Sequence, residues 1–235
     1  MSEAAELRVM TFNVRSLRDD VEALAMAVRE CAPDVLLVQE APRFLRWRSK
    51  RAALARRCGL VVATADRPGG LCVMTNLRVD VVGTSFALLP KTSRRHQRVI
   101  VGATVSFGGV PWRVVTVHFS TDRDERRRHL PAIWSALSVD SSAPLIVGGD
   151  LNEPPAGPVF SELAGKLQDC FAVAGSSVGG GLTSPAATPA LRLDAILADP
   201  ALTVVSCEAV SVTGVTTASD HRPVLAVLRQ NLVDR

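Results

Sequence analysis

The chain has 235 residues, a formal net charge of +4, an isoelectric point near 9.1 and an apolar share of 47%. That apolar content is ample for a substantial core, and no composition break or low-complexity linker divides the chain, so we expect a single domain over residues 1–235. Its apolar runs are too short for a membrane span, and the N-terminus lacks the basic start and apolar core of a signal peptide. We therefore expect a cytoplasmic protein with no membrane span and no obligate protein partner.

The five cysteines are odd in number, are scattered, and lie mostly in apolar runs; they are Cys31, Cys58, Cys72, Cys170 and Cys207. This distribution predicts buried, reduced thiols rather than a disulfide framework. No two of the cysteines have the spacing of zinc ligands, which argues against a zinc site.

Apolar periodicity predicts mixed α and β structure in chain order. Helical spacing occurs over residues 18–30, 43–57, 123–137 and 157–164. Short apolar or alternating runs predict strands over 7–12, 34–38, 60–64, 70–75, 79–88, 98–105, 111–117, 143–147, 191–197, 203–210 and 223–228. The paired glycines between the strands at 98–105 and 111–117 indicate an antiparallel hairpin, so we expect two sheets rather than one doubly wound parallel sheet.

Basic residues gather in two segments, 43–57 (RFLRWRSKRAALARR) and 123–129 (RDERRRH). Each could present a positive surface to a phosphate-rich partner, or each could be the solvated face of a helix. His96 and His129 lie in such basic stretches, and we expect both on the surface. A loop rich in Gly, Ser and Pro over 175–189 is long enough to have a function.

The stretch VGGDLNEP at 147–154 follows an apolar strand and brings Asp150 and Asn152 to a turn. Two glycines before them allow the backbone to come close to another object, which we expect to be a ligand. A carboxylate there can hold a hard cation or accept a proton, and an amide can donate to a phosphoryl oxygen. The alternative is a polar turn that caps the following helix.

Further polar residues follow or begin apolar strands along the whole chain; they are Asn13, Glu40, His118, Asp194, Asp220 and His221. Glu40 and Asp220 could share a magnesium ion, because hard cations prefer oxygen ligands. Asp194 interrupts an apolar strand, and a buried carboxylate there needs a partner. An imidazole such as His221, held by Asp194, is what a general base or a phosphate-stabilising group requires.

In this order the segments resemble the endonuclease/exonuclease/phosphatase family, which comprises DNase I-like, metal-dependent phosphoesterases. The matching segments are TFNVR with Asn13, PDVLLVQE with Glu40, VVTVHFS with His118, LIVGGDLNEPP with Asp150 and Asn152, LRLDAIL with Asp194, and SDHRPV with Asp220 and His221. The resemblance spans nearly the whole chain. It implies an α+β fold, a four-layered α/β sandwich in which two mixed sheets pack face to face with helices outside.

The resemblance also implies phosphoester hydrolysis with Mg²⁺, for which Mn²⁺ can substitute. Glu40 would be the main metal ligand, helped by Asn13 and Asp220. Asp150 and His221 are both candidates for activating water. Asn152 and His118 would hold phosphoryl oxygens, and Asp194 would orient His221.

Two residues depart from the family pattern. Thr116 stands where an asparagine is common, and Ala195 stands where an aromatic residue often follows the aspartate. Arg98 is a candidate for contacting substrate phosphate, and it could equally be a solvated residue at the rim.

The sequence favours a phosphodiesterase or phosphatase and leaves the substrate open between nucleic acid and a small molecule or lipid headgroup. The competing hypothesis is a catalytically silent member that binds a phosphorylated ligand or partner. Loss of Glu40, Asp150 or His221 would mark such a member, and all three are present.

Overall fold

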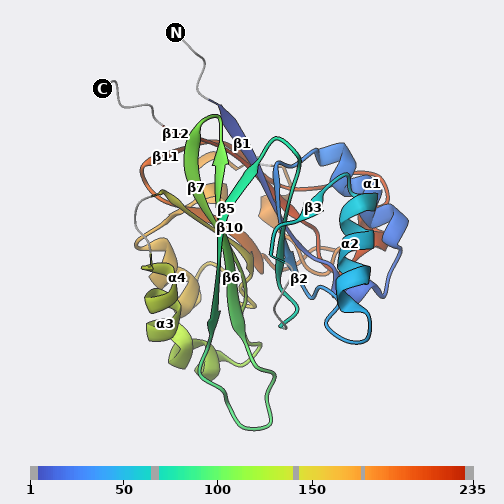
Figure 1. Ribbon diagram of the computed structural model, residues 1–235. Helices are drawn as coiled ribbons and strands as arrows, with labels where there is room; N and C mark the ends of the chain where they lie inside the picture. Colours follow the sequence, from blue (N-terminus) through green and yellow to red (C-terminus); the bar gives the residue numbers. More distant parts are fainter. Residues whose placement is uncertain (1–4, 65–68, 140–142, 176–177, 231–235) are drawn as a thin grey trace.

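The structure is a computed structural model that describes residues 5–64, 69–139, 143–175 and 178–230. Within these residues the strands form two six-stranded sheets (Figure 1). The first sheet, in the order β11-β12-β1-β2-β4-β3, contains β1 (Glu6–Asn13), β2 (Val35–Gln39), β3 (Val61–Val62), β4 (Cys72–Thr75), β11 (Leu202–Ala209) and β12 (Val224–Gln230). The second, in the order β5-β6-β7-β8-β10-β9, contains β5 (Asp80–Leu88), β6 (Val99–Phe107), β7 (Val110–His118), β8 (Leu145–Asp150), β9 (Gln168–Asp169) and β10 (Asp194–Ala198).

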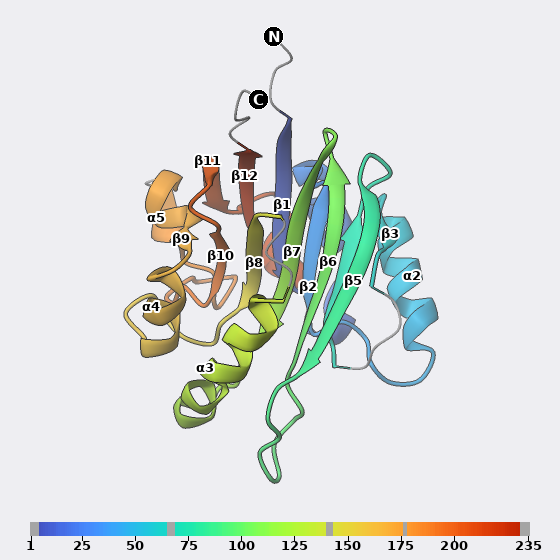
Figure 2. The same cartoon turned by 60° about the vertical axis from the view of Figure 1, so that its left-hand side comes forward.

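Both sheets are mixed. β1 runs parallel to β2, and β7 runs parallel to β8, whereas the other pairs are antiparallel. In the middle of each sheet, therefore, two strands end at the same edge. This arrangement brings the ends of β1 and β2 close to the ends of β7 and β8, because the two sheets lie against each other (Figure 2).

Side-chain alternation along β1 shows how one strand serves two layers. Leu7 and Val9 belong to the apolar core between the sheets, whereas Met10 and Phe12 belong to the core on the other face. A strand has a side-chain period of two, so a strand buried on both faces must be apolar at consecutive positions. The uninterrupted apolar runs in the sequence have this cause.

Helices α1 (Val21–Cys31) and α2 (Trp47–Arg57) cover the outer face of the first sheet (Figure 1). Leu24 of α1 and Leu54 of α2 are fully buried in the same core as Met10 and Phe12. The carboxylate of Asp20 caps α1 by accepting hydrogen bonds from two free backbone N–H groups of its first turn.

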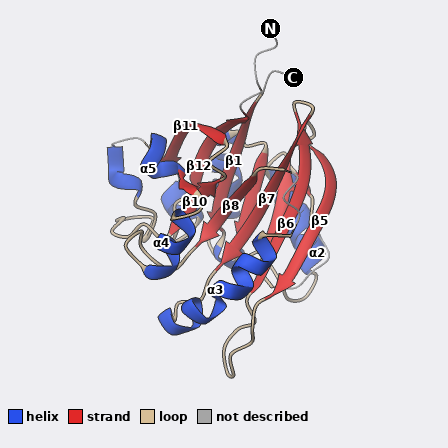
Figure 3. Cartoon of the chain, turned by 90° about the vertical axis from the view of Figure 1, so that its left-hand side faces the viewer, coloured by secondary structure: helices blue, strands red, loops and turns tan. Residues whose placement is uncertain are grey.

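Helices α3 (Arg123–Leu137) and α4 (Pro158–Ala164) cover the outer face of the second sheet (Figure 3). Ile133 and Phe160 of these helices pack there with Val115 and Val147. Shorter helical segments complete the described chain: η1 (Arg15–Leu17), α5 (Cys170–Ala174), η2 (Val178–Gly181) and α6 (Val215–Ala218). The layers run helix, sheet, sheet, helix. The four-layered α/β sandwich expected from the sequence is confirmed.

The glycine pair before Asp150 does not make room for a ligand, contrary to the expectation from the sequence. Gly148 and Gly149 lie inside β8, which continues to Asp150. A Cβ at Gly148 would lie 2.6 Å from Leu37 of the facing sheet, and one at Gly149 would lie 2.0 Å from the Val117 carbonyl oxygen of the neighbouring strand. The close object is therefore the protein itself rather than a ligand.

Two further expectations need correction. The helix predicted over 43–57 begins only at Trp47, because Arg46 has a left-handed backbone conformation with φ of 56°. His129 is buried rather than on the surface, with only 1% of it exposed. Its Nε2 lies 2.9 Å from the carbonyl oxygen of Pro90, because the loop between β5 and β6 folds over this face of α3.

The five cysteines are buried and free, as predicted. Among the described helices, none has the length and apolar character that a membrane crossing requires.

Candidate active site

The polar residues singled out in the sequence lie along one edge of the sandwich. Asn13, His118 and Asp150 are the last residues of β1, β7 and β8, respectively, and Glu40 directly follows β2. Asp194 is the first residue of the antiparallel strand β10 and lies directly opposite Asp150 in the ladder. His118 lies opposite Asp150 on the other side. Register alone thus places two of these side chains next to Asp150.

Asp150 is the centre of the arrangement, and only 2% of it is exposed. Its Oδ2 accepts a hydrogen bond from the Asn13 amide at 3.0 Å, which links the two sheets. The same oxygen lies 3.5 Å from Nε2 of His118 and 4.0 Å from Nε2 of His221. Oδ1 accepts from the backbone N–H of Asn152 at 2.9 Å. The carboxylate is therefore surrounded by donors that fix its orientation.

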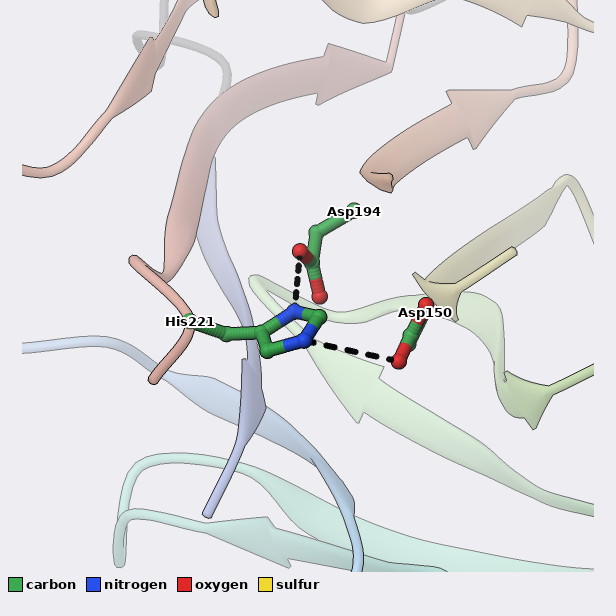
Figure 4. Close-up of side chains that lie close together, drawn as sticks. All are labelled: Asp150, Asp194 and His221. Atoms are coloured by element: carbon green, nitrogen blue, oxygen red, sulfur yellow. Dashed lines mark hydrogen bonds and ion pairs between the residues drawn. The ribbon is translucent and has the colours of Figure 1, made fainter. Parts of the chain in front are cut away.

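Asp194 and His221 form the closest side-chain pair of the site, with 2.7 Å between Oδ2 and Nδ1 (Figure 4). This contact directs the other ring nitrogen of His221 toward Asp150 (Figure 4). The second oxygen of Asp194, Oδ1, is buried and has no hydrogen-bond partner among the residues that the structure describes. Burying a carboxylate oxygen without a hydrogen-bond partner costs folding free energy, so this oxygen is available to a ligand from outside the protein.

Burial and neighbouring charges shift the pKa values of the two histidines and Asp150 in different directions. Burial lowers the pKa of His118 to about 4, against the opposing effect of Asp150. Burial, with the Asp194 charge, raises the pKa of Asp150. For His221, burial alone would lower the pKa, but the hydrogen bond and charge of Asp194, together with Asp150 and Asp220, raise it to about 9. At neutral pH one histidine is thus neutral and the other is protonated.

Glu40 lies beside this group at the edge of a cavity of about 230 Å³. Its Oε1 accepts a weak hydrogen bond from the Asn13 amide at 3.4 Å, so Asn13 bridges Glu40 and Asp150. The cavity is also lined by His118 and Arg98. Burial lowers the pKa of Arg98, against the opposing charges of Asp150, Glu125 and Glu40. The structure thus brings Arg98 to the site.

Asp220 is placed differently. Its side chain is 44% exposed, and its Oδ2 pairs with Nε of Arg15 at 3.2 Å. No hydrogen bond or ion pair joins it to Glu40 among the described residues. The loop over 175–189 reaches this segment, because the backbone N–H of Ala186 donates to the carbonyl oxygen of Asp220 at 2.7 Å. Residues 176 and 177 of that loop lie outside the described residues.

Two of these residues have left-handed backbone conformations. Glu40 and Asn152 both have φ of 50°, a region that non-glycine residues rarely adopt. A glycine would relieve this strain but would remove the side chain, so their presence suggests that the side chains themselves matter. The amide of Asn152 donates to the carbonyl oxygen of Phe119 at 3.0 Å, and it has a second N–H to offer.

Sequence reasoning missed the buried ion pair that supports the turn after Asp150. Arg126 of α3 contacts Glu153 at 3.1 Å, and both side chains are at least nine-tenths buried. The other oxygen of Glu153 accepts from the backbone N–H groups of Val159 and Phe160 at the start of α4. The position of Glu153, directly after Asn152, was the signal in the sequence that could have pointed to it. Exposure cannot be judged from a sequence, and the segment 123–129 is consistent there both with a positive surface and with the solvated face of a helix.

Thr116, one of the departures from the family pattern, lies at the contact between the sheets. It is fully buried, and its hydroxyl accepts a hydrogen bond from Gln39 at 2.9 Å. Ala195 is buried in the core under α3 and α4. Neither side chain reaches the group around Asp150 through a hydrogen bond or ion pair in the described part of the chain.

The residues present are compatible with a divalent cation. Asp150, Asp194 and His221 offer potential ligand atoms that lie within 4.8 Å of one another, but His221 is protonated at neutral pH and directs both ring nitrogens at carboxylates, so the oxygen atoms are the candidate ligands. Asp194 has the unpartnered oxygen noted above, and only one oxygen of Glu40 accepts a hydrogen bond among the described residues. Oxygen-rich donor sets of this kind suit Mg²⁺ or Mn²⁺. In contrast, Asn13 turns its N–H groups to the carboxylates, and its own oxygen accepts from the backbone of Arg15 at 3.1 Å.

Comparisons with known proteins identify the family and the fold. The sequence profile of the Endonuclease/Exonuclease/phosphatase family matches residues 10–221. A family member from Bacteroides vulgatus superposes with a TM-score of 0.79 at 18% identity, covering 97% of this chain and 100% of that one. A mannosyl-6-phosphatase from Bacteroides thetaiotaomicron gives 0.77 at 17% identity, covering 94% and 99%. TDP2 from D. rerio, solved with a single-stranded DNA product, gives 0.71 at 18% identity, covering 96% and 100%.

A comparison with curated protein sequences found no match. The profile covers most of the chain, and the protein belongs to the endonuclease/exonuclease/phosphatase family, a family of phosphoester hydrolases.

Proposed function

We propose that this protein hydrolyses phosphodiesters by in-line attack of water, with a divalent cation, most simply Mg²⁺, bound at the edge that carries Glu40 and Asp150. The observation that carries this proposal is the convergence of Asp150, His118 and the Asp194–His221 pair on one point, with Asn13 bridging from the facing sheet. Donors and positive charge that meet at one point are what a phosphoryl group requires when it gains charge in the transition state.

Asp150 serves as the general base in this proposal. Its raised pKa makes it a stronger proton acceptor than an ordinary aspartate, whereas His221 already carries a proton at neutral pH. Water loses a proton to Asp150 as its oxygen bonds to phosphorus, the ester P–O bond on the opposite side breaks, and the leaving alkoxide takes a proton from solvent. Protonated His221, oriented by Asp194, stabilises the phosphoryl oxygens together with His118 and the amide of Asn152.

The metal would be held mainly by Glu40, with Asp220 and Asn13 as further candidates. When bound, it would supply positive charge to the phosphoryl group. Asp220 and Asn13 are the weaker assignments, because Asp220 is engaged by Arg15 and Asn13 must turn to offer its oxygen. Arg98, in the same cavity, is proposed to contact a phosphate oxygen.

Hydrolysis of bis(p-nitrophenyl) phosphate tests the proposal. We expect activity with Mg²⁺ or Mn²⁺ and its loss with EDTA. Glu40→Ala, Asp150→Ala and His221→Ala should each lower kcat/KM by about 100-fold or more, because a general base or an oxyanion donor typically contributes this much. Asp124→Asn, an exposed change in α3, is the control and should leave activity unchanged.

Full activity in all three alanine variants would contradict the site assignment. A screen of DNA, RNA, phosphomonoesters and phospholipid headgroups, with Asp150→Ala as the blank, then identifies the substrate. Binding without hydrolysis of every ester would instead support a silent family member.

A further inference from the structure

The cavity beside Glu40 does not end at the catalytic residues. A second hollow of about 340 Å³ adjoins it, and the two share the lining residues Arg43, Gly69, His96 and Gln97. The second hollow is completed by three apolar side chains, Phe44, Leu88 and Val99. The combined cleft therefore has a polar half, which contains Glu40 and His118, and an apolar half beside it.

The apolar half exposes side chains that folding leaves unburied. Phe44 is 73% exposed and Leu88 is 63% exposed, whereas Val99 is only 3% exposed. The guanidinium of Arg43 lies 5.0 Å from the centre of the Phe44 ring. Exposed apolar side chains around a hollow, with polar groups at its rim, are typical of a ligand site rather than of a bare surface.

The contents of the polar half limit what the apolar half can hold. Because the two halves are continuous, a phosphoester bound at Glu40 and His118 can place one of its substituents in the apolar half, beside Phe44. Basic groups border the hollow at Arg43 and His96, and no acidic residue is among the described residues that line it. A substituent that is flat, apolar on its faces and part of a polyanion fits this combination.

The neighbouring chain extends the same pattern. Arg46, Arg48 and Lys50 are exposed at and near the start of α2, directly after Phe44 in sequence. These side chains can meet further phosphates of a strand that leaves the cleft over α2, because single-stranded nucleic acid is bound by aromatic platforms combined with basic tracks. An acyl chain would use the hollow but has no negative charge to complement these basic side chains.

We propose that the hollow formed by Phe44, Leu88 and Val99 binds a nucleobase next to the scissile phosphate, with one face of the base stacked on Phe44. The substrate is accordingly a single-stranded oligonucleotide. This inference rests on the proposed function, because it places the phosphate of that nucleotide among Glu40, Asp150 and His118.

Three dinucleoside phosphates test the inference: thymidylyl-thymidine, and the two analogues in which either the 5′ or the 3′ base is absent. All contain the same phosphodiester, and chromatography of the products gives kcat/KM. Loss of one particular base should lower kcat/KM by about 5- to 150-fold, since stacking of a base on an aromatic side chain is worth about 1 to 3 kcal/mol. Loss of the other base should have a smaller effect.

Substitution of Phe44 then decides whether stacking on this ring, or another contact, causes the preference for the base. In Phe44→Ala the preference for the base-bearing ester should fall toward 1, and in Phe44→Trp it should be kept or increased. Leu45→Ala changes a neighbouring side chain that is 82% exposed and does not line the hollow, so the preference should stay as in the unchanged protein.

The inference is overturned if neither base matters, or if the preference survives in Phe44→Ala. It is also overturned if a long-chain alkyl phosphodiester is cleaved better than thymidylyl-thymidine and loses this advantage in Phe44→Ala. If no ester is hydrolysed, the proposed function fails instead. Affinities of the same three dinucleoside phosphates, measured in EDTA with both Phe44 variants, then decide the inference.

Discussion

Two histidines lie beside Asp150, and their surroundings move their pKa values in opposite directions. The pKa of His118 falls to about 4 through burial, and that of His221 rises to about 9 because its partnership with Asp194 outweighs burial. Chemically identical side chains thus differ in charge within one site. The difference has several causes: burial dominates at His118, whereas at His221 the 2.7 Å hydrogen bond and the charge of Asp194, together with Asp150 and Asp220, outweigh burial.

This difference predicts how the stability of the metal-free protein depends on pH. Between the ordinary value of 6.5 and about 9, folded His221 holds a proton that the unfolded chain releases. The stabilisation is fully present below pH 6.5 and is lost as the pH rises through 9. Asp194→Asn should remove this loss, on the order of 2 kcal/mol, as measured by urea unfolding in EDTA from pH 6 to 9.5.

His118 affects the pH dependence of stability below neutral pH, and with the opposite sign to that of His221. Between pH 6.5 and about 4 the unfolded chain binds a proton that the buried imidazole does not, so its contribution destabilises the fold as the pH falls. His118→Asn should flatten that part of the curve, and His96→Asn, an exposed control, should change neither part. An Asp194→Asn profile identical to that of the unchanged protein would contradict the assigned pairing.

At the scale of elements, the turn between β8 and α4 is held from both ends. Glu153 joins Arg126 of α3 to the first backbone N–H groups of α4, so one carboxylate fixes the segment that carries Asn152. A Cβ at Gly157 would lie 2.0 Å from Glu153, so a larger residue there would displace this carboxylate. The turn is therefore built as a rigid support rather than as a loose loop.

Removal of this support should cost both stability and activity. Glu153→Ala leaves Arg126 buried without its partner and α4 without its cap, which should lower the free energy of unfolding by about 3 to 5 kcal/mol. Glu162→Ala, an exposed change on α4, is the control and should have little effect. Equal denaturation midpoints for the two variants would show that the network contributes nothing.

The order of elements could be predicted because apolar periodicity reports burial directly. Strands such as β2 are apolar at consecutive positions, and Asp194 or Asp150 at a strand end is conspicuous against them. The sequence contains no comparable signal for the burial of Arg126 and His129, since that burial depends on which segments fold over α3. The short helices α5 and α6 were also missed, because five and four residues are too few to show a helical period.

At the scale of the whole molecule, the distance between the two sheets sets the geometry of the site. Asn13 belongs to one sheet and Asp150 to the other, and Gln39 and Thr116 form a second hydrogen bond across the same gap. Gly148 and Gly149 allow the strands to approach this closely. Any side chain added there must push the layers or strands apart.

Gly149→Ala should therefore destabilise the fold strongly, by about 3 kcal/mol or more, because its new methyl group meets a backbone carbonyl that cannot rotate away. Gly165→Ala is the matched control. A Cβ there would make ordinary contacts at 3.4 Å, and the backbone φ of −72° suits an alanine. Thermal unfolding of the two variants compares them. Similar melting temperatures would mean that the sheets tolerate more separation than their packing indicates.

The pairing of β12 with β1 also has a kinetic consequence. Ser219, just before β12, donates to the carbonyl oxygen of Asn13, a residue 206 positions earlier in the chain. His221 reaches the site only when this contact between distant segments has formed, and such contacts form late because their loops are entropically expensive to close. During refolding, the return of hydrolysis should therefore lag behind the return of helical circular dichroism.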